Sequence, residues 1–150
     1  MREIDVETRV AIEQLVAELL WRLDHGRADT TWELYTEDAV STGPLGDMGG
    51  RDAIKEWGQR RAKITGVLGR HHVGGIRLAW EGDELHGWTQ YVTYRDSAEN
   101  PLVPASVGEF REVYRKVDGD WKIARRNIAP IFGGANAAAH AKRLAESGTQ

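Results

Sequence analysis

The sequence predicts an α+β fold in which three N-terminal helices pack on one face of a curved antiparallel sheet. Two observations predict this fold. Over much of residues 6–63, apolar residues recur every three or four positions, as in amphipathic helices. From residue 70 onward, long segments alternate apolar with polar residues and are separated by tight turns, which is typical of an antiparallel meander. We expect the helices and the sheet to enclose one pocket.

The first predicted helix spans residues 6–28. Its apolar stripe consists of Val6, Val10, Leu15, Val16, Leu19, Leu20 and Leu23. Asp24 follows Leu20 by one turn, so its carboxylate lies at the buried edge of this stripe. A buried carboxylate is seldom left without a partner, so we expect Asp24 to have one.

Two shorter helices and a short strand are expected next. The second helix is predicted over residues 31–36 and the strand over residues 39–43, before a glycine-rich loop. The third helix is predicted over residues 52–63, with Asp52 as its N-cap.

Four long strands complete the predicted sheet, over residues 71–81, 85–96, 105–117 and 121–131. Gly82-Asp83 and Asp118-Gly119 are the expected hairpin turns. We interpret residues 1–132 as one domain and residues 133–150 as a tail. The alanine-rich part of the tail favours a helix, and it is expected to fray, to cap the pocket or to pack across a dimer.

Composition excludes several classes of function. The formal net charge is −3, without a long basic run, so nothing favours a nucleic-acid partner. The chain has no cysteine, which excludes thiolate nucleophiles and cysteine-based zinc sites. No apolar run is long enough to span a membrane, and the charged N-terminal segment is unlike a signal peptide, so we expect a cytoplasmic protein.

The two adjacent histidines, His71 and His72, are the candidate proton-transfer groups because imidazole titrates near neutral pH. Strict alternation along the strand places His72 on the same face as Ile76. A one-residue bulge at Gly74-Gly75 would reverse the alternation and direct His71 inward instead.

The order of these elements resembles the SnoaL-like domains of the nuclear transport factor 2-like superfamily. The resemblance is carried by L-D-H-G-R-A-D at residues 23–29, W-E-L-Y-T-E-D-A-V at residues 32–40, G-R-D-A-I at residues 50–54 and V-D-G-D-W-K-I-A at residues 117–124. It implies a cone-shaped, mixed sheet around one pocket. It also implies pairing of domains through the outer sheet face, so we expect a homodimer or a higher homo-oligomer.

Within this superfamily, residues 71–78 are most similar to scytalone dehydratase, and also to hexachlorocyclohexane dehydrochlorinase and bile-acid dehydratases. The resemblance implies that Asp24 and His71 form a general-base dyad facing the pocket. The second catalytic histidine of scytalone dehydratase has no counterpart here, since the matching stretch reads P-A-S-V at residues 104–107.

We therefore expect a cofactor-independent lyase of dehydratase type, or an isomerase, acting on a hydrophobic, cyclic, oxygenated small molecule. A polyketide cyclase or ketosteroid isomerase-like enzyme is one alternative. A non-catalytic small-molecule-binding or assembly module is another, because one fold supports many functions.

Six further side chains are candidates for contact with the substrate. Trp21, Trp57, Trp88 and Tyr91 are expected to form pocket walls. Arg125 and Asn127 continue the alternation of Trp121 and Ile123, so they are expected to point inward and to donate to an oxyanion. The remaining histidines lack metal-ligand spacing, and we expect no metal.

Overall fold

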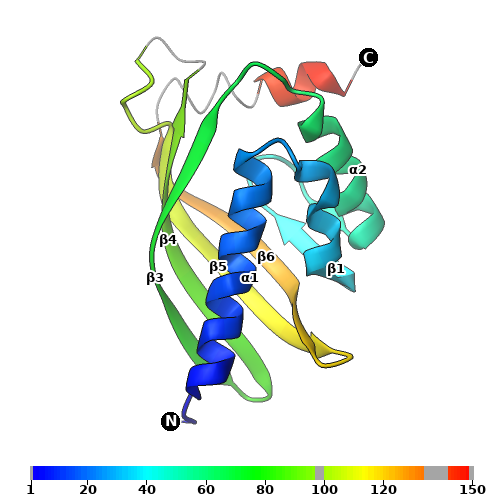
Figure 1. Ribbon diagram of the computed structural model, residues 1–150, viewed down its shortest axis with the longest axis vertical. Helices are drawn as coiled ribbons and strands as arrows, with labels where there is room; N and C mark the ends of the chain where they lie inside the picture. The colour runs from blue at the N-terminus through cyan, green and yellow to red at the C-terminus, as the bar shows by residue number, and fades with distance from the viewer. Residues whose placement is uncertain (1, 97–99, 134–141, 149–150) are drawn as a thin grey trace.

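Six strands form a single mixed, curved sheet that does not close on itself, and the two longer α-helices lie on one of its faces (Figure 1). The computed structural model describes residues 2–96, 100–133 and 142–148. The strand order in the sheet is β2-β1-β6-β5-β4-β3. The predicted α+β class is confirmed.

The helical part consists of α1 (Val6–Asp24), the 3-10 helix η1 (Ala28–Leu34) and α2 (Arg51–Ala62). Asp5 caps α1, because its carboxylate accepts a hydrogen bond from the backbone N–H of Thr8 at 2.7 Å. Gly26 has a φ of +72° just after the end of α1. The chain therefore reverses earlier than predicted, and the second helix is a 3-10 helix three residues ahead of the expected α-helix.

The contact between η1 and α2 depends on Gly58. A Cβ atom at this position would lie 2.3 Å from the carbonyl oxygen of Ala28, closer than any side chain tolerates. Glycine thus lets the backbones of the two helices touch, and α2 is held against the segment that follows Asp24.

The strands are β1 (Tyr35–Thr42), β2 (Met48–Gly49), β3 (Gly69–Glu81), β4 (Glu84–Arg95), β5 (Ser106–Val117) and β6 (Asp120–Gly133). The last four form the predicted meander, with ends within two residues of those expected. β1 begins at Tyr35 rather than at residue 39 and pairs in parallel with β6, which makes the sheet mixed.

The main core lies between α1 and the sheet. Its most buried large side chains include Ile12 and Leu19 of α1, Leu85 of β4, Phe110 of β5 and Ile123 of β6. Two register shifts, one within residues 73–76 of β3 and one at the pairing of Val113 and Tyr114 with β6, decide which side chains of these strands face the helices.

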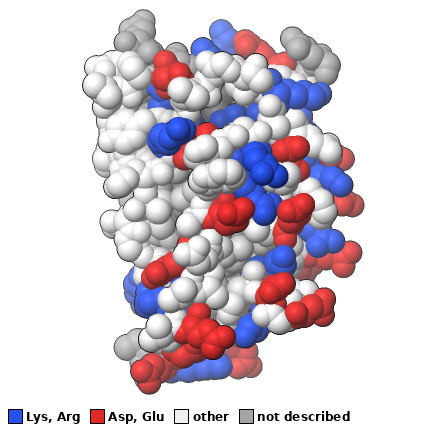
Figure 2. All heavy atoms as spheres, in the orientation of Figure 1, with Lys and Arg blue, Asp and Glu red and all other residues white. Residues whose placement is uncertain are grey.

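Residues 142–147 of the predicted tail are helical, whereas the alanine-rich residues 135–141 lie outside the described residues. The division at residue 132 remains a prediction. No helix in the described part of the chain is long and apolar enough to cross a membrane. Figure 2 shows acidic and basic side chains intermixed over the helical side, and few charges at the left of the view, over β3 and β4.

Candidate active site

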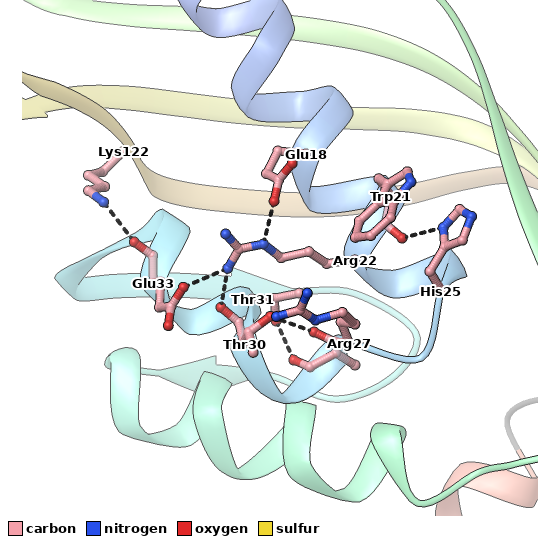
Figure 3. Close-up of polar contacts among 10 residues, drawn as sticks. Glu18, Trp21, Arg22, His25, Arg27, Thr30, Thr31, Glu33 and Lys122 are labelled. Carbon is pink, nitrogen blue, oxygen red and sulfur yellow. Dashed lines mark hydrogen bonds and ion pairs between the residues drawn. The ribbon is translucent and has the colours of Figure 1, made fainter.

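Asp24 is the last residue of α1, and a polar network fixes this end of the helix (Figure 3). Nη1 of Arg22 donates to the backbone oxygen of Thr30 and to the carboxylate of Glu33, both at 2.7 Å. Lys122 of β6 donates to the backbone oxygen of Glu33 at 2.8 Å. These contacts join α1 to η1 and η1 to β6, so the end of the helix that carries Asp24 is connected to the sheet through η1.

His71 reaches the helical side of the sheet because β3 contains a bulge. The register of β3 against β4 shifts between residues 73 and 76, where β3 has one residue more than its partner. The alternation therefore reverses at Gly74-Gly75, so that His71 lies inward and His72 is exposed. The bulge expected from the sequence is present, and His71 rather than His72 is the inward histidine.

The side chains of Asp24 and His71 are hydrogen-bonded. Nδ1 of His71 lies 2.7 Å from one carboxylate oxygen, and the backbone N–H of His71 donates to the other, also at 2.7 Å. An ionised carboxylate only accepts hydrogen bonds, so Nδ1 carries the proton. The lone pair of the neutral ring then lies on Nε2, which makes no hydrogen bond with the described part of the chain.

The surroundings keep His71 neutral and Asp24 ionised. Burial lowers the pKa of His71 below its ordinary value of 6.5, the hydrogen bond and charge of Asp24 offset part of this effect, and the charges of Arg95 and Arg126 lower the pKa further. Burial alone would raise the pKa of Asp24, but the side-chain and backbone hydrogen bonds from His71, together with the charge of Arg95, hold it below 3.8. A neutral imidazole oriented by a carboxylate is the arrangement of a general base.

A cavity of about 210 Å³ opens beside His71, between the helices and the sheet. Its apolar lining includes Leu19, Leu23, Ile54, Phe110 and Ile128. Trp57 and Tyr91, two of the predicted wall residues, also line it. Asp24 does not, which corrects the expectation that both dyad residues face the pocket: the carboxylate lies behind the imidazole, with its side chain only 7% exposed.

The sequence matches the pattern of the SnoaL-like domain over residues 5–127, most of the chain. The protein belongs to the SnoaL-like family. The family resemblance inferred from the sequence is therefore confirmed. A search of curated proteins found no match.

Solved structures support the same fold. A Mycobacterium tuberculosis protein of unknown function is 21% identical, with a TM-score of 0.77 over 92% of this chain and 86% of that one. A candidate scytalone dehydratase from Novosphingobium aromaticivorans is 23% identical, with a TM-score of 0.72 over 86% and 87%. A nuclear transport factor 2-like protein with a cystatin-like fold, from the same organism, is 26% identical, with a TM-score of 0.70 over 89% and 88%.

Two of the tryptophans expected in the pocket of this SnoaL-like domain lie elsewhere. Trp21 is 47% exposed and stacks on His25, because it follows Leu20 by one position and so leaves the apolar stripe of α1. Trp88 lies on the opposite sheet face, where the guanidinium of Arg77 covers its ring at 4.4 Å. Trp88 and Tyr91 are an odd number of residues apart on one strand, so both cannot face the pocket.

The inward placement predicted for Arg125 and Asn127 is wrong. β6 has one extra residue near Ala124, because Val113 pairs with Arg125 while the next residue of β5 pairs with Ile123. The alternation reverses there. Arg125 forms an ion pair with Glu84 at 2.6 Å, and Asn127 donates to the Thr42 hydroxyl at 2.8 Å, both outside the cavity.

The same bulge turns Arg126 toward the cavity, a position that strict alternation along β6 does not predict. Its guanidinium is hydrogen-bonded to Glu112, and the Tyr114 hydroxyl donates to the same carboxylate at 2.6 Å. Both charged residues are at most 4% exposed. The guanidinium group of Arg126 also lies over the Phe110 ring, with its Cζ atom 4.0 Å from the ring centroid.

Arg61 and Arg95, two further buried residues of the cavity wall, were also missed, although the sequence contained a signal for each. On α2, Arg61 follows Ile54 by seven positions and therefore lies on the same helix face. On β4, Arg95 follows Tyr91 by four and therefore shares its sheet face.

No group of three or more histidine, aspartate or glutamate side chains within the described ranges is arranged to hold a metal ion.

Proposed function

We propose that this protein is a cofactor-independent lyase of dehydratase type, acting on a hydrophobic, cyclic molecule that carries a carbonyl group and a hydroxyl group on the second carbon from it. His71 is the general base, and Asp24 is a positioning residue. The observation that carries the proposal is the Asp24–His71 pair, hydrogen-bonded at 2.7 Å, with His71 at the wall of a largely apolar cavity.

In the proposed reaction, Nε2 of His71 takes a proton from the carbon beside the carbonyl group. The C–H electron pair forms an enolate, and the imidazole becomes an imidazolium that Asp24 stabilises. The enolate electrons then form the carbon–carbon double bond as the C–O bond of the hydroxyl group breaks. The departing hydroxide takes the proton from His71 and leaves as water, so the base is regenerated.

Tyr91 is the proposed donor to the developing oxyanion. Its hydroxyl group lies 3.3 Å from the Ser106 hydroxyl, and both residues line the cavity together with His71. Two hydroxyl groups have two O–H donors, and only one is used in the hydrogen bond between them. The other can donate to a negatively charged oxygen in an apolar site. Tyr91 takes the role that was predicted for Arg125 and Asn127, which lie outside the cavity.

Deuterium exchange tests the proposal over a range of candidate substrates. A panel of cyclic β-hydroxy ketones is incubated with the protein in D₂O and followed by mass spectrometry, which detects both deuterium uptake beside the carbonyl group and loss of water. We expect both, and we expect His71→Ala to reduce them about 100- to 10,000-fold. His72→Ala is the matched control, because His72 is the exposed neighbour.

Other outcomes distinguish the alternatives. Deuterium uptake with double-bond migration but no loss of water would indicate an isomerase. Binding of panel members without any deuterium uptake would contradict catalysis and indicate a binding module.

We also propose that the domain forms a homodimer through the sheet face opposite the helices, where Trp88 and Tyr94 are partly exposed. Light scattering at high concentration tests this assembly. A species of 16.8 kDa alone would contradict it.

A further inference from the structure

Two cations of the cavity wall, Arg61 and Arg95, form no direct ion pair or hydrogen bond with an acidic side chain in the described part of the chain. Each is only 7% exposed, and both line the cavity that contains His71. Nη1 of Arg95 is fully buried and has no hydrogen-bond partner. Arg126, the third arginine of the wall, differs because its charge is matched by Glu112.

The two guanidinium groups act on each other and on one shared carboxylate. Burial and the nearby charge of Arg61 lower the pKa of Arg95 to about 10, while Asp24 raises it. Burial lowers the pKa of Arg61, and Asp24 raises it. Both oxygens of Asp24 accept hydrogen bonds from His71. The carboxylate of Asp24 is therefore the one negative charge that acts on both arginines, and its hydrogen bonds are made with His71 and not with them.

The guanidinium group of Arg95 lies beside the start of β3, close to His71, the proposed base. A Cβ atom at Gly69 would meet Nη1 of Arg95 at 2.1 Å, so glycine at this position makes room for the guanidinium. Gly69 precedes His71 by two residues on the same strand. The cation therefore lies at the same end of the cavity as the imidazole.

Keeping two buried guanidinium groups beside one carboxylate is unfavourable unless a further anion joins them. An arginine fork matches the two oxygens of a carboxylate, which can accept parallel N–H bonds. The rest of the lining is apolar, with Leu19, Phe110 and Ile128. The cavity is thus positively charged where Arg61 and Arg95 lie and apolar along most of the rest of its lining.

We propose that Arg61 and Arg95 form a carboxylate-binding site, so that the substrate of this protein is a hydrophobic ring bearing a carboxylate. The assignment of this group to a substrate rests on the proposed function, whereas binding of the anion does not. The carboxylate lies against the arginines, and the ring lies along the apolar lining. The anion fixes which carbon is presented to His71.

Calorimetric titration with 2-naphthoate and its neutral counterpart, 2-naphthamide, tests the site. We expect the wild-type protein to bind the acid about tenfold or more tightly than the amide, because hydrogen bonds between charged partners are stronger than neutral ones. Arg61→Met and Arg95→Met are each expected to weaken naphthoate binding about tenfold and to leave naphthamide binding unchanged. Arg60→Met is the matched control, since Arg60 is the exposed neighbour of Arg61 on α2.

The thermal midpoint Tm provides a second readout and shows whether each variant is folded. Naphthoate is expected to raise the Tm of the wild type and of Arg60→Met more than that of Arg61→Met or Arg95→Met at the same ligand concentration. Arg95→Lys, which keeps the charge but loses the fork, is expected to give an intermediate affinity. Equal binding of acid and amide by the wild type, no binding of naphthoate, or an equal loss in Arg60→Met would each overturn the proposal.

The same titration on His71→Ala separates this proposal from the proposed activity. The preference for naphthoate is expected to persist there, because the arginines are intact. A wild-type preference for naphthoate without deuterium exchange on any ketone would refute the activity alone. Exchange on neutral ketones together with equal binding of acid and amide would refute the anion site alone.

Discussion

Both carboxylate oxygens of Asp24 accept hydrogen bonds from one residue, His71: one from the imidazole Nδ1 and one from the backbone N–H, each at 2.7 Å. Attachment at two points fixes the rotation of the ring as well as its tautomer. It also ties the end of α1 to the start of β3. The orientation of the proposed base is thus part of the packing of helix on sheet.

Replacing Asp24 by asparagine is expected to reduce turnover about 100- to 10,000-fold. An amide has one acceptor oxygen, so its NH₂ group must face either the ring N–H or the backbone N–H of His71. The downfield Nδ1 proton of His71 in the NMR spectrum reports the bond directly and is expected to be lost or shifted. Asp29→Asn, a substitution at an exposed position after α1, is the control and should leave the signal in place.

The titration of His71 is expected below pH 6.5, because burial lowers its pKa in the folded protein. The unfolded chain, with an ordinary imidazole, takes up the proton first as the pH falls. The contribution of His71 to the free energy of unfolding is therefore fully present above about pH 6.5. It is lost as the pH falls from there through the lower pKa of His71 in the folded protein. NMR titration of the imidazole checks the direction, and a midpoint above 6.5 would contradict it.

Arg95→Met is expected to raise the pKa of His71, because the charge of Arg95 lowers that pKa in the wild type. The NMR titration of the imidazole measures the shift. Arg60→Met, at an exposed position of α2, should leave the midpoint unchanged. An unchanged or lower midpoint in Arg95→Met would show that Arg95 does not act on the base.

The fold could be predicted because its signals are local. Helical periodicity, alternation and the two hairpin turns placed the four long strands within two residues of their ends. The parallel pairing of β1 with β6 had no such signal, since it joins segments more than 80 residues apart. The position of η1 was missed because Gly26 turns the chain just after α1.

In the candidate site, the outcome depended on two bulges. The bulge in β3 is marked by Gly74-Gly75, so the inward position of His71 could be weighed from the sequence. The bulge near Ala124 has no glycine and no other mark, so Arg125 was placed inward and Arg126 was missed. A single extra residue moves every later side chain of a strand to the opposite face of the sheet. The position of that residue becomes visible only from the register with the neighbouring strand.

Glu112→Gln is expected to destabilise the protein by about 3–5 kcal/mol, because it leaves the guanidinium of Arg126 buried without a countercharge. Tyr114 also loses its charged acceptor. Urea unfolding at pH 7 measures the change. Glu109→Gln on the same strand is the matched control: its pair with Arg111 is partly exposed and should contribute less than about 1 kcal/mol. Similar losses in the two variants would contradict a special role for the buried pair.

Deleting both Gly74 and Gly75 is expected to separate His71 from Asp24. The double deletion leaves His71 and Ile76 three positions apart, an odd number, so under strict alternation β3 cannot present both His71 and Ile76 to the helical side. The Ile76 side chain packs against the core and is expected to keep its face, which turns His71 outward. The downfield Nδ1 proton of His71 should then disappear.

Gly75→Ala is the matched control for this deletion. A Cβ atom at Gly75 meets no other atom within 4 Å, so alanine fits there while the length of the strand stays the same. We expect this variant to keep the Nδ1 signal of His71 and its pKa. The thermal midpoints show whether both variants are folded. A double deletion that folds and still shows the His71–Asp24 hydrogen bond would mean that the chain places a bulge elsewhere, and that Gly74-Gly75 does not determine which histidine faces the cavity.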